Sequence, residues 1–177
     1  DSTGDWSSDV CSSDLELPIK RSNASPPQKD GQKVVGAGAD KAARLLDLAA
    51  NGAPPTQVAA HDAPISCVHF LDLPSSNAAM VVTGSWDRTV KYWDLRQQRA
   101  AASVECQERV YSMDVKGDLL VVGTADRYIN IIKLDNPTVF HQALRSPLLH
   151  QTRVVSCFNE ANGFAIGSIE EIGRAHV

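Results

Sequence analysis

The sequence predicts an all-β fold, a partial β-propeller with about three to three and a half four-stranded blades. One observation is a motif that recurs without a gap at Val34–Leu48, Val81–Leu95 and Leu120–Leu134. A second is the regular spacing of an acidic residue in the central turn of each motif. A period of about 40–45 residues with four short strands per unit is typical of propeller blades. Such blades stack radially because one blade cannot bury both faces of its sheet alone.

The acidic turn residues are Asp40, Asp87, Asp126 and Glu170, separated by 47, 39 and 44 residues. A strand of small residues precedes each turn, and a strand of alternating character follows it, as in Val90–Trp93. Alternation with period two places successive side chains on opposite faces of a blade. Further strands are predicted at Ile65–Phe70, Val110–Val115, Val154–Phe158, Thr56–Ala60, Ala101–Cys106 and Phe140–Leu144.

One segment favours another structure when it is taken alone. Residues Ala39–Ala50 are rich in good helix formers, with Leu45, Leu46 and Leu48 near helical spacing. The gapless alignment of this segment with the motif that ends at Leu95 favours a strand, because tertiary context often overrides local propensity. We therefore expect a strand here.

The two ends of the chain are related to each other. One set of codons for Asp9–Leu15 (DVCSSDL) has a reverse complement that translates as EIGRAHV, which is Glu171–Val177. An inverted repeat around an insert is typical of a ligated sequencing adapter, and two natural tails are the alternative. We expect residues 1–15 and 171–177 to be adapter-derived, residues 16–32 to be a loop or linker, and residues 33–170 to form the blades. The natural protein is then expected to continue beyond Glu170, and the uncovered outer faces should make residues 16–170 unstable or aggregation-prone alone.

Composition excludes several classes of protein. The net charge of −4 gives no basic surface for bulk nucleic-acid binding. The sequence shows no secretory signal and no apolar run long enough for a membrane span. Its four cysteines are widely spaced, with no C-x-x-C pair and no nearby His at metal-ligand spacing, which favours reduced thiols over a metal site (Cys11, Cys67, Cys106 and Cys157). We expect no metal, no cofactor, no catalytic residue and no small-molecule substrate.

The best-preserved repeat carries four polar residues that match the hydrogen-bond tetrad of WD40 repeats: His61, Thr83, Asp87 and Trp93. Their donors and acceptors can link indole, hydroxyl, imidazole and carboxylate in one chain. A hydroxyl–His–Asp set also invites a hydrolase interpretation, but we favour a structural brace because this set belongs to the fold itself. The other repeats lack it, with Gly36 and Leu46, or Val122 and Ile132, in place of the Thr and Trp.

In WD40 proteins the working surface is the top rim, formed by the residue before each turn acid and by the start of each innermost strand. The candidates here are Trp86, Arg109, Tyr111, Arg153 and Val155. An exposed Trp with Arg and Tyr neighbours is the composition of an interface anchor. The alternative is an ordinary rim with a half-packed Trp.

Longer phrases make the resemblance more specific: HDAPISCVHF, VTGSWDRTVKYWDLR, ERVYSMDV, VVGTADRYI, LDNPT, SPLLHQTRVVSCF and GFAIGSIE. Together, over roughly Gly31–Glu170, they resemble the nuclear-pore mRNA export factors, which are seven-bladed WD40 propellers. The sister family of spindle-checkpoint WD40 proteins shares HDAPI, TGSWD and GSIE-like elements. ADRYINI, LDNPT and SPLLHQTRVVSCF favour the export factors.

The resemblance implies a non-enzymatic scaffold that docks a short acidic nucleoporin peptide motif, with single-stranded RNA as a second partner to test. It also implies residence in the nucleus at the nuclear pore and envelope, with cytoplasmic shuttling. The alternatives are a mitotic-checkpoint adaptor that binds kinetochore peptides and a substrate receptor of a ubiquitin ligase.

Overall fold

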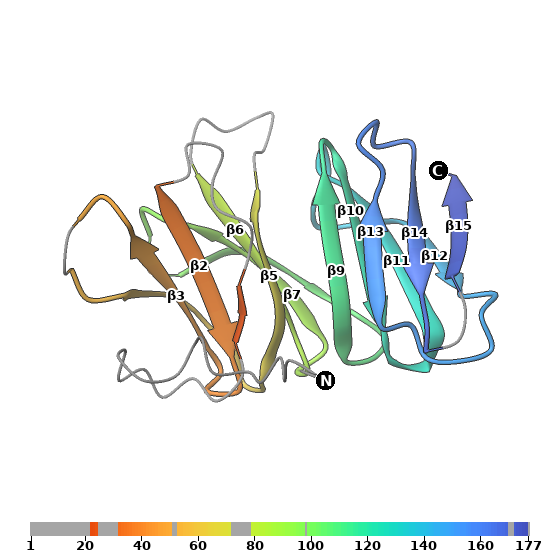
Figure 1. Ribbon diagram of the computed structural model, residues 1–177, viewed down its shortest axis with the longest axis horizontal. Helices are drawn as coiled ribbons and strands as arrows, with labels where there is room; N and C mark the ends of the chain where they lie inside the picture. Colours follow the sequence, from red (N-terminus) through yellow and green to blue (C-terminus); the bar gives the residue numbers. More distant parts are fainter. Residues whose placement is uncertain are drawn as a thin grey trace, which may run out of the picture.

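The computed structural model describes residues 22–24, 32–50, 53–71, 79–97, 99–169 and 172–176. Within these ranges the chain forms β-strands, one short 3-10 turn at Ala125–Arg127 and no α-helix (Figure 1). The strands form three four-stranded sheets and one three-stranded sheet, and each strand pairs antiparallel with its neighbour in the chain. The prediction of an all-β chain with three four-stranded blades and part of a fourth is confirmed.

The first blade contains β1 (Ser22–Ala24), β2 (Lys33–Gly38), β3 (Ala42–Asp47) and β4 (Thr56–Ala60). The second contains β5 (Ile65–Leu71), β6 (Met80–Ser85), β7 (Thr89–Asp94) and β8 (Ala100–Glu105). The third contains β9 (Val110–Lys116), β10 (Leu119–Thr124), β11 (Tyr128–Lys133) and β12 (Phe140–Arg145). The fourth contains β13 (Val154–Cys157), β14 (Gly163–Gly167) and β15 (Ile172–His176).

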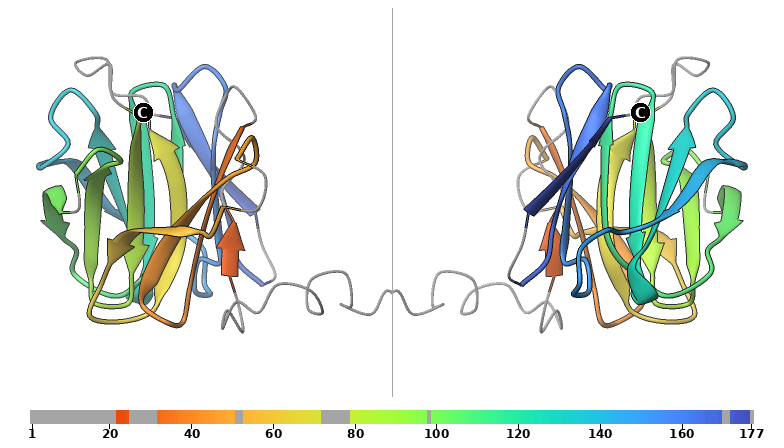
Figure 2. Two further views of the ribbon diagram at one scale, coloured as in Figure 1. Left: turned by 90° about the vertical axis from the view of Figure 1, so that its left-hand side faces the viewer. Right: turned by 90° about the vertical axis from the view of Figure 1, so that its right-hand side faces the viewer.

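The blades meet through the strands that open them. β5 contacts β9, and β9 contacts β13, which lies beside it in Figure 1. The side views show the strands running between two ends of the molecule, where the turns gather (Figure 2). The turns at residues 39–41, 86–88 and 125–127 all lie at one end. This end is the top rim, and it points downward in Figure 1.

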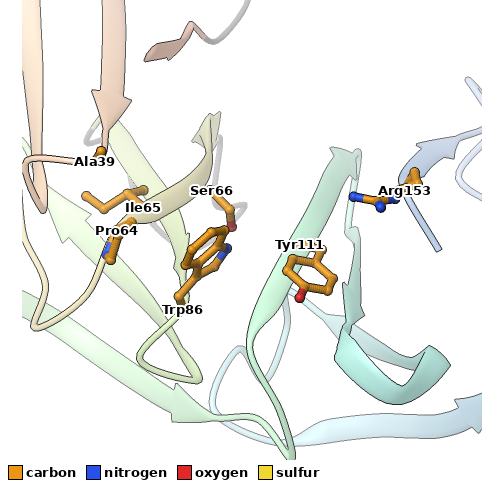
Figure 3. Close-up of a pocket in the computed structure, with 7 residues that line it drawn as sticks. All are labelled: Ala39, Pro64, Ile65, Ser66, Trp86, Tyr111 and Arg153. Atoms are coloured by element: carbon orange, nitrogen blue, oxygen red, sulfur yellow. The ribbon is translucent and has the colours of Figure 1, made fainter. Parts of the chain in front are cut away.

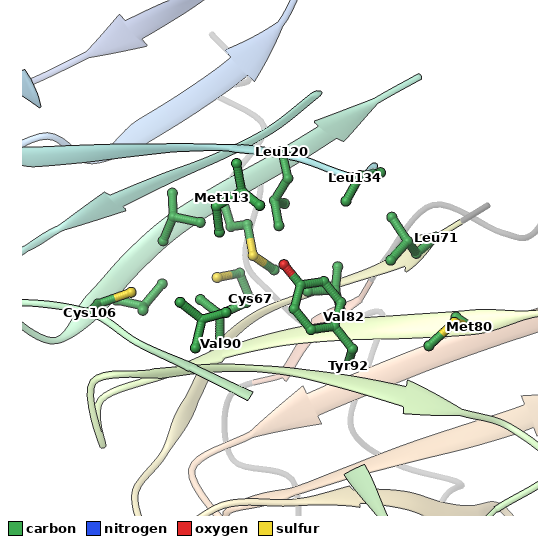
Figure 4. Close-up of a cluster of buried hydrophobic side chains, with 14 residues drawn as sticks. Cys67, Leu71, Met80, Val82, Val90, Tyr92, Cys106, Met113, Leu120 and Leu134 are labelled. Carbon is green, nitrogen blue, oxygen red and sulfur yellow. The ribbon is translucent and has the colours of Figure 1, made fainter. Parts of the chain in front are cut away.

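Three apolar clusters fill the spaces between consecutive blades. On β6 and β7 the alternation of side chains sends Val81 and Trp93 toward the first blade, and Val82 and Tyr92 toward the third. Figure 4 shows Tyr92 and Val82 in the cluster with Met113 of the third blade. Every residue of β6 and of β10 is buried because a neighbouring blade covers each face of its sheet.

Two glycines allow the second strand of one blade to approach the first strand of the next blade closely. A Cβ on Gly84 would lie 2.7 Å from Cγ1 of Val110 and 2.9 Å from Sγ of Cys67. A Cβ on Gly123 would lie 2.8 Å from Oγ of Ser112, in the equivalent place between the third and fourth blades. Small residues at these positions are therefore a packing requirement of the stack.

The repeats also share their turn geometry. The residue after the turn acid has a positive φ in three blades, at Lys41 (66°), Arg88 (68°) and Arg127 (64°). The segment Ala39–Ala50 contains strand β3 rather than a helix, as the alignment predicted, because Ala43 packs in the core between the first two blades. The turn acid Glu170 lies outside the described residues.

One segment differs from the sequence prediction, and one other forms a strand for which no structure was predicted. The prediction of a loop or linker over residues 16–32 is wrong for Ser22–Ala24, which pair with Gly36–Gly38 as β1. Open backbone groups along the free edge of β2 supply the partner for this short strand. Residues Ile172–His176, within the segment expected to be adapter-derived, pair with β14 as β15. Residues 1–21 lie outside the described ranges.

Candidate functional site

A chain of hydrogen bonds runs through the second blade from its core to its rim turn. The indole N–H of Trp93 donates to the hydroxyl of Thr83 at 2.8 Å. The same hydroxyl lies 2.7 Å from Nε2 of His61, and Nδ1 of His61 lies 2.8 Å from a carboxylate oxygen of Asp87. The structure thus brings together all four residues of the predicted tetrad.

One protonation pattern satisfies the tetrad. With its proton on Nδ1, a neutral His61 donates to Asp87 and accepts the Thr83 hydroxyl proton at Nε2. Burial lowers the pKa of His61, against an opposing effect of Asp87. Burial raises the pKa of Asp87, but hydrogen bonds from Thr89 and His61 outweigh it and lower that pKa to about 2. At neutral pH the pair is therefore a neutral imidazole beside a carboxylate.

The geometry of the tetrad supports a structural brace. The side chain of Thr83 is fully buried, and its hydroxyl already accepts the indole N–H. A nucleophile must be reached by its substrate, and the core between the first two blades covers this hydroxyl. The tetrad therefore fixes the rim turn to the core.

The third blade fills the same positions with apolar side chains. The backbone N–H of Cys106 donates to the carbonyl of Arg88, as that of His61 donates to the carbonyl of Lys41. Cys106 thus stands where His61 does, and Val122 and Ile132 replace Thr83 and Trp93. All three pack in the cluster between the second and third blades. Hydrophobic burial replaces the hydrogen-bond chain in this blade.

The rim candidates meet at a pocket of about 470 Å³ that draws residues from all four blades: Ala39, Pro64, Ile65, Ser66, Trp86, Tyr111 and Arg153 (Figure 3). Trp86 stands in the rim turn of the second blade, and Tyr111 stands on β9 of the third. Their rings meet edge to face, with centroids 6.2 Å apart and an interplanar angle of 83°. Trp86 remains 43% exposed, so its indole is open to a partner.

The predicted candidates divide into three groups. Trp86, Tyr111 and Arg153 line the pocket. Arg109 is exposed but does not line it. Val155 is a wrong candidate, because only 7% of it is exposed and it packs in the core between the third and fourth blades.

The error at Val155 is one of register. Val110 packs against Gly84, and Val155 packs against the equivalent Gly123. In its own sheet Val155 pairs with Ile166, the residue before Gly167, as Met113 pairs with Val122, the residue before Gly123. Val155 therefore corresponds to the buried Met113 rather than to Tyr111, and it points inward.

The remaining lining residues were missed by the sequence reasoning. Ala39 is the counterpart of Trp86 in the first blade, because each precedes the turn acid. This equivalence between repeats could have identified Ala39 from the sequence. Pro64, Ile65 and Ser66 open the second blade, as Arg109 to Tyr111 open the third.

The chemistry of the pocket suits a peptide segment. Arg153 is the one charged residue among those that line it. The aromatic pair offers a rigid apolar surface, the Ser66 side chain offers a hydroxyl, and Arg153 offers a donor to a carboxylate. An apolar side chain followed or preceded by an acidic one would fit this combination.

Other chemistry finds little support in the described residues. Burial raises the pKa of the Cys67, Cys106 and Cys157 thiols to about 12, so all three stay protonated at neutral pH. Across the described ranges, no group of three or more His, Cys, Asp or Glu side chains is placed to hold a metal ion. The same ranges contain no helix that is long and apolar enough to cross a membrane.

The chain is similar to known WD40 proteins. Residues 52–94 match the family "WD domain, G-beta repeat". The chain is 61% identical to mRNA export factor GLE2 of Chaetomium thermophilum, over 80% of this chain and 39% of that protein. It is 44% identical to the Poly(A)+ RNA export protein of Schizosaccharomyces pombe, over 80% of this chain and 40% of that protein.

A checkpoint protein is also similar. The chain is 43% identical to mitotic checkpoint protein BUB3.1 of Arabidopsis thaliana, over 62% of this chain and 33% of that protein. The chain spans about two fifths of the length of the export factors it matches.

Proposed function

Because the chain belongs to the WD40-repeat family of the GLE2 and Rae1 mRNA export factors, which is related to the BUB3 proteins, we propose that it is part of a non-enzymatic scaffold in nuclear mRNA export. The scaffold docks an acidic nucleoporin peptide motif on the rim pocket. A role of this kind requires residence at the nuclear pore and envelope, with passage to the cytoplasm.

The rim pocket is the observation that carries this proposal. It combines an edge-to-face aromatic pair, Trp86 and Tyr111, with the single positive charge of Arg153. Aromatic and Arg side chains dominate binding energy at protein interfaces, and a carboxylate on the peptide would pair with Arg153. The tetrad in the same blade holds the Trp86 turn in place through Asp87.

RNA is the second proposed partner. Arg88 and Arg109 are exposed at the rim end, outside the pocket. Guanidinium groups there can contact phosphates while a peptide occupies the pocket. An RNA contribution of this kind would weaken steeply as salt is raised.

A second candidate function is checkpoint adaptor, which the similarity to the mitotic checkpoint protein favours. The experiment that separates the two is affinity capture from nuclear and mitotic extracts with the complete protein that contains these blades. The matched control is a Trp86→Ala/Arg153→Ala variant. Recovery of a nucleoporin by the wild type but not by the variant supports the proposal. Recovery of kinetochore proteins without any nucleoporin overturns it in favour of the checkpoint function.

A further inference from the structure

Leu149 is an exposed apolar side chain on the rim that the pocket does not include. It lies between β12 and β13, and 73% of it is exposed. Blades flank this position on both sides, so it is not part of the uncovered face of the first or fourth blade. In the described ranges, Trp86 is the other large apolar side chain that is exposed at the rim and has a blade on each side. Single exposed apolar side chains are common on protein surfaces, but Leu149 differs because an ordered loop holds it outward.

The loop that carries Leu149 is fixed by side chains rather than being free. Nη1 of Arg127 donates to the carbonyls of Leu148 and Leu149, at 2.9 and 3.2 Å. Nε2 of Gln151 donates to the carbonyl of Thr124 at 2.7 Å, which ties the loop back to β10.

The leucine that precedes Leu149 points the other way. Leu148 is buried in the cluster between the third and fourth blades, and its N–H donates to Oγ of Ser146 at 3.2 Å. With its neighbour anchored in the core, Leu149 is held pointing outward.

The same loop leads into the rim pocket. Four residues after Leu149 it reaches Arg153, whose side chain lines the pocket and whose N–H donates to the carbonyl of Gly167 at 2.8 Å. One ordered segment therefore presents an apolar side chain and a positive charge at the same end of the molecule. Because the loop is already ordered, a partner that binds it loses little conformational entropy.

We propose that Leu149 is a second apolar contact for the peptide that occupies the rim pocket, and that Arg127 is the residue that positions it. This inference rests on the proposed function. The occupant is an extended acidic segment: its carboxylate pairs with Arg153, and an apolar side chain a few residues along the segment packs on Leu149. An extended chain rises about 3.3 Å per residue, so a short segment can reach both groups.

The test is a fluorescence-anisotropy titration of the complete protein with a labelled synthetic peptide of the acidic nucleoporin motif. Leu149→Ala is expected to weaken binding about tenfold without changing the melting temperature. Val139→Ala is the control, because Val139 is another exposed aliphatic side chain (55%) but lies at the opposite end of the third blade from the rim.

Arg127→Ala tests the positioning role. It should weaken binding as Leu149→Ala does, and the double variant should bind no more weakly than either single variant, because both changes remove the same contact. Gln151→Ala provides an independent loosening of the loop if Arg127→Ala does not fold. Additive losses in the double variant would overturn the positioning role of Arg127.

The outcomes separate this inference from the proposed function. Unchanged affinity of Leu149→Ala, with affinity lost in Arg153→Ala, overturns the second contact and leaves the proposed function standing. Unchanged affinity in both variants contradicts the proposed function itself. Equal losses in Leu149→Ala and Val139→Ala would show a general effect of surface change and would also overturn the second contact.

Discussion

The indole N–H of Trp93 donates a 2.8 Å hydrogen bond to the hydroxyl of Thr83, and both side chains are buried. Through His61 and Asp87 this bond connects the core of the second blade to the turn that carries Trp86. The third blade has the same backbone arrangement with Val122 and Ile132 in these places. The same blade fold is thus stabilised by a hydrogen-bond chain in the second blade and by apolar packing in the third.

Thr83→Val should destabilise the complete protein although it copies the residue of the third blade. The change keeps the shape but leaves the indole N–H of Trp93 and Nε2 of His61 without their partner. Unpaired buried polar groups cost about 1–3 kcal/mol each, so a loss of that order is expected in urea denaturation. The triple variant with His61→Cys and Trp93→Ile removes these polar groups as well. The tetrad is uncoupled if the triple variant is less stable than Thr83→Val by the full losses that His61→Cys and Trp93→Ile cause when each is made alone.

Gly84→Ala should destabilise the contact between the second and third blades. The new Cβ would meet Cγ1 of Val110 at 2.7 Å, and overpacking of this kind costs about 1–3 kcal/mol. Val110→Ala in the same protein makes room for the Cβ. The double variant should therefore lose less stability than the two single losses added together. Simple additivity, measured by chemical denaturation, would mean that the clash is absent.

Stability should fall as the pH is lowered through the range where histidines titrate. Burial lowers the pKa of His61 and of His69 below the usual 6.5. The unfolded chain therefore takes up protons first, and stability that is complete above pH 6.5 is lost as the pH falls toward the folded-state pKa values. Urea denaturation at pH 8 and pH 5.5 measures this change, and His61→Gln should make it smaller. Equal stability at the two pH values would contradict the neutral state of His61.

The isolated 177-residue chain should associate with itself. Leu48 in the first blade and Ile169 in the fourth are 53% and 67% exposed, and each lies on a blade that has a neighbour on one side only. Uncovered apolar faces and open strand edges favour association between copies. Light scattering at increasing concentration should show growing particles. A monomeric chain that melts cooperatively would refute this expectation.

The strands of the blades could be predicted from the sequence more completely than the residues of the rim pocket. Three gapless motifs were enough to predict β2, β3, β6, β7, β10 and β11, because alternation and turn residues are local signals. They also predicted a strand over the Ala39–Ala50 segment, where helix formers favour the opposite structure. β1 was not predicted, because Ser22–Ala24 carry no pattern of their own and gain their structure from the edge of β2.

The pocket depends on how neighbouring blades meet, which no single repeat encodes. Trp86, Tyr111 and Arg153 were found from their positions within the repeat, but Pro64 and Ser66 were not, although they open the second blade as Arg109–Tyr111 open the third. Val155 was placed wrongly because the irregular loop before β13 hides the register of that strand, in which Val155 takes the place of Met113 rather than that of Tyr111. A long connection of this kind breaks the spacing on which sequence alignment between blades depends.

The central claim is that Trp93 holds the fold while Trp86 binds the partner. The direct measurement is the affinity of the complete protein for a labelled acidic nucleoporin peptide, taken together with the melting temperature, in Trp86→Ala and Trp93→Phe. We expect Trp86→Ala to bind at least about tenfold more weakly with an unchanged melting temperature, because its side chain is an exposed aromatic anchor. Trp93→Phe should melt earlier yet bind normally while folded. Wild-type affinity in Trp86→Ala, or a loss of binding that only follows unfolding, would contradict the claim.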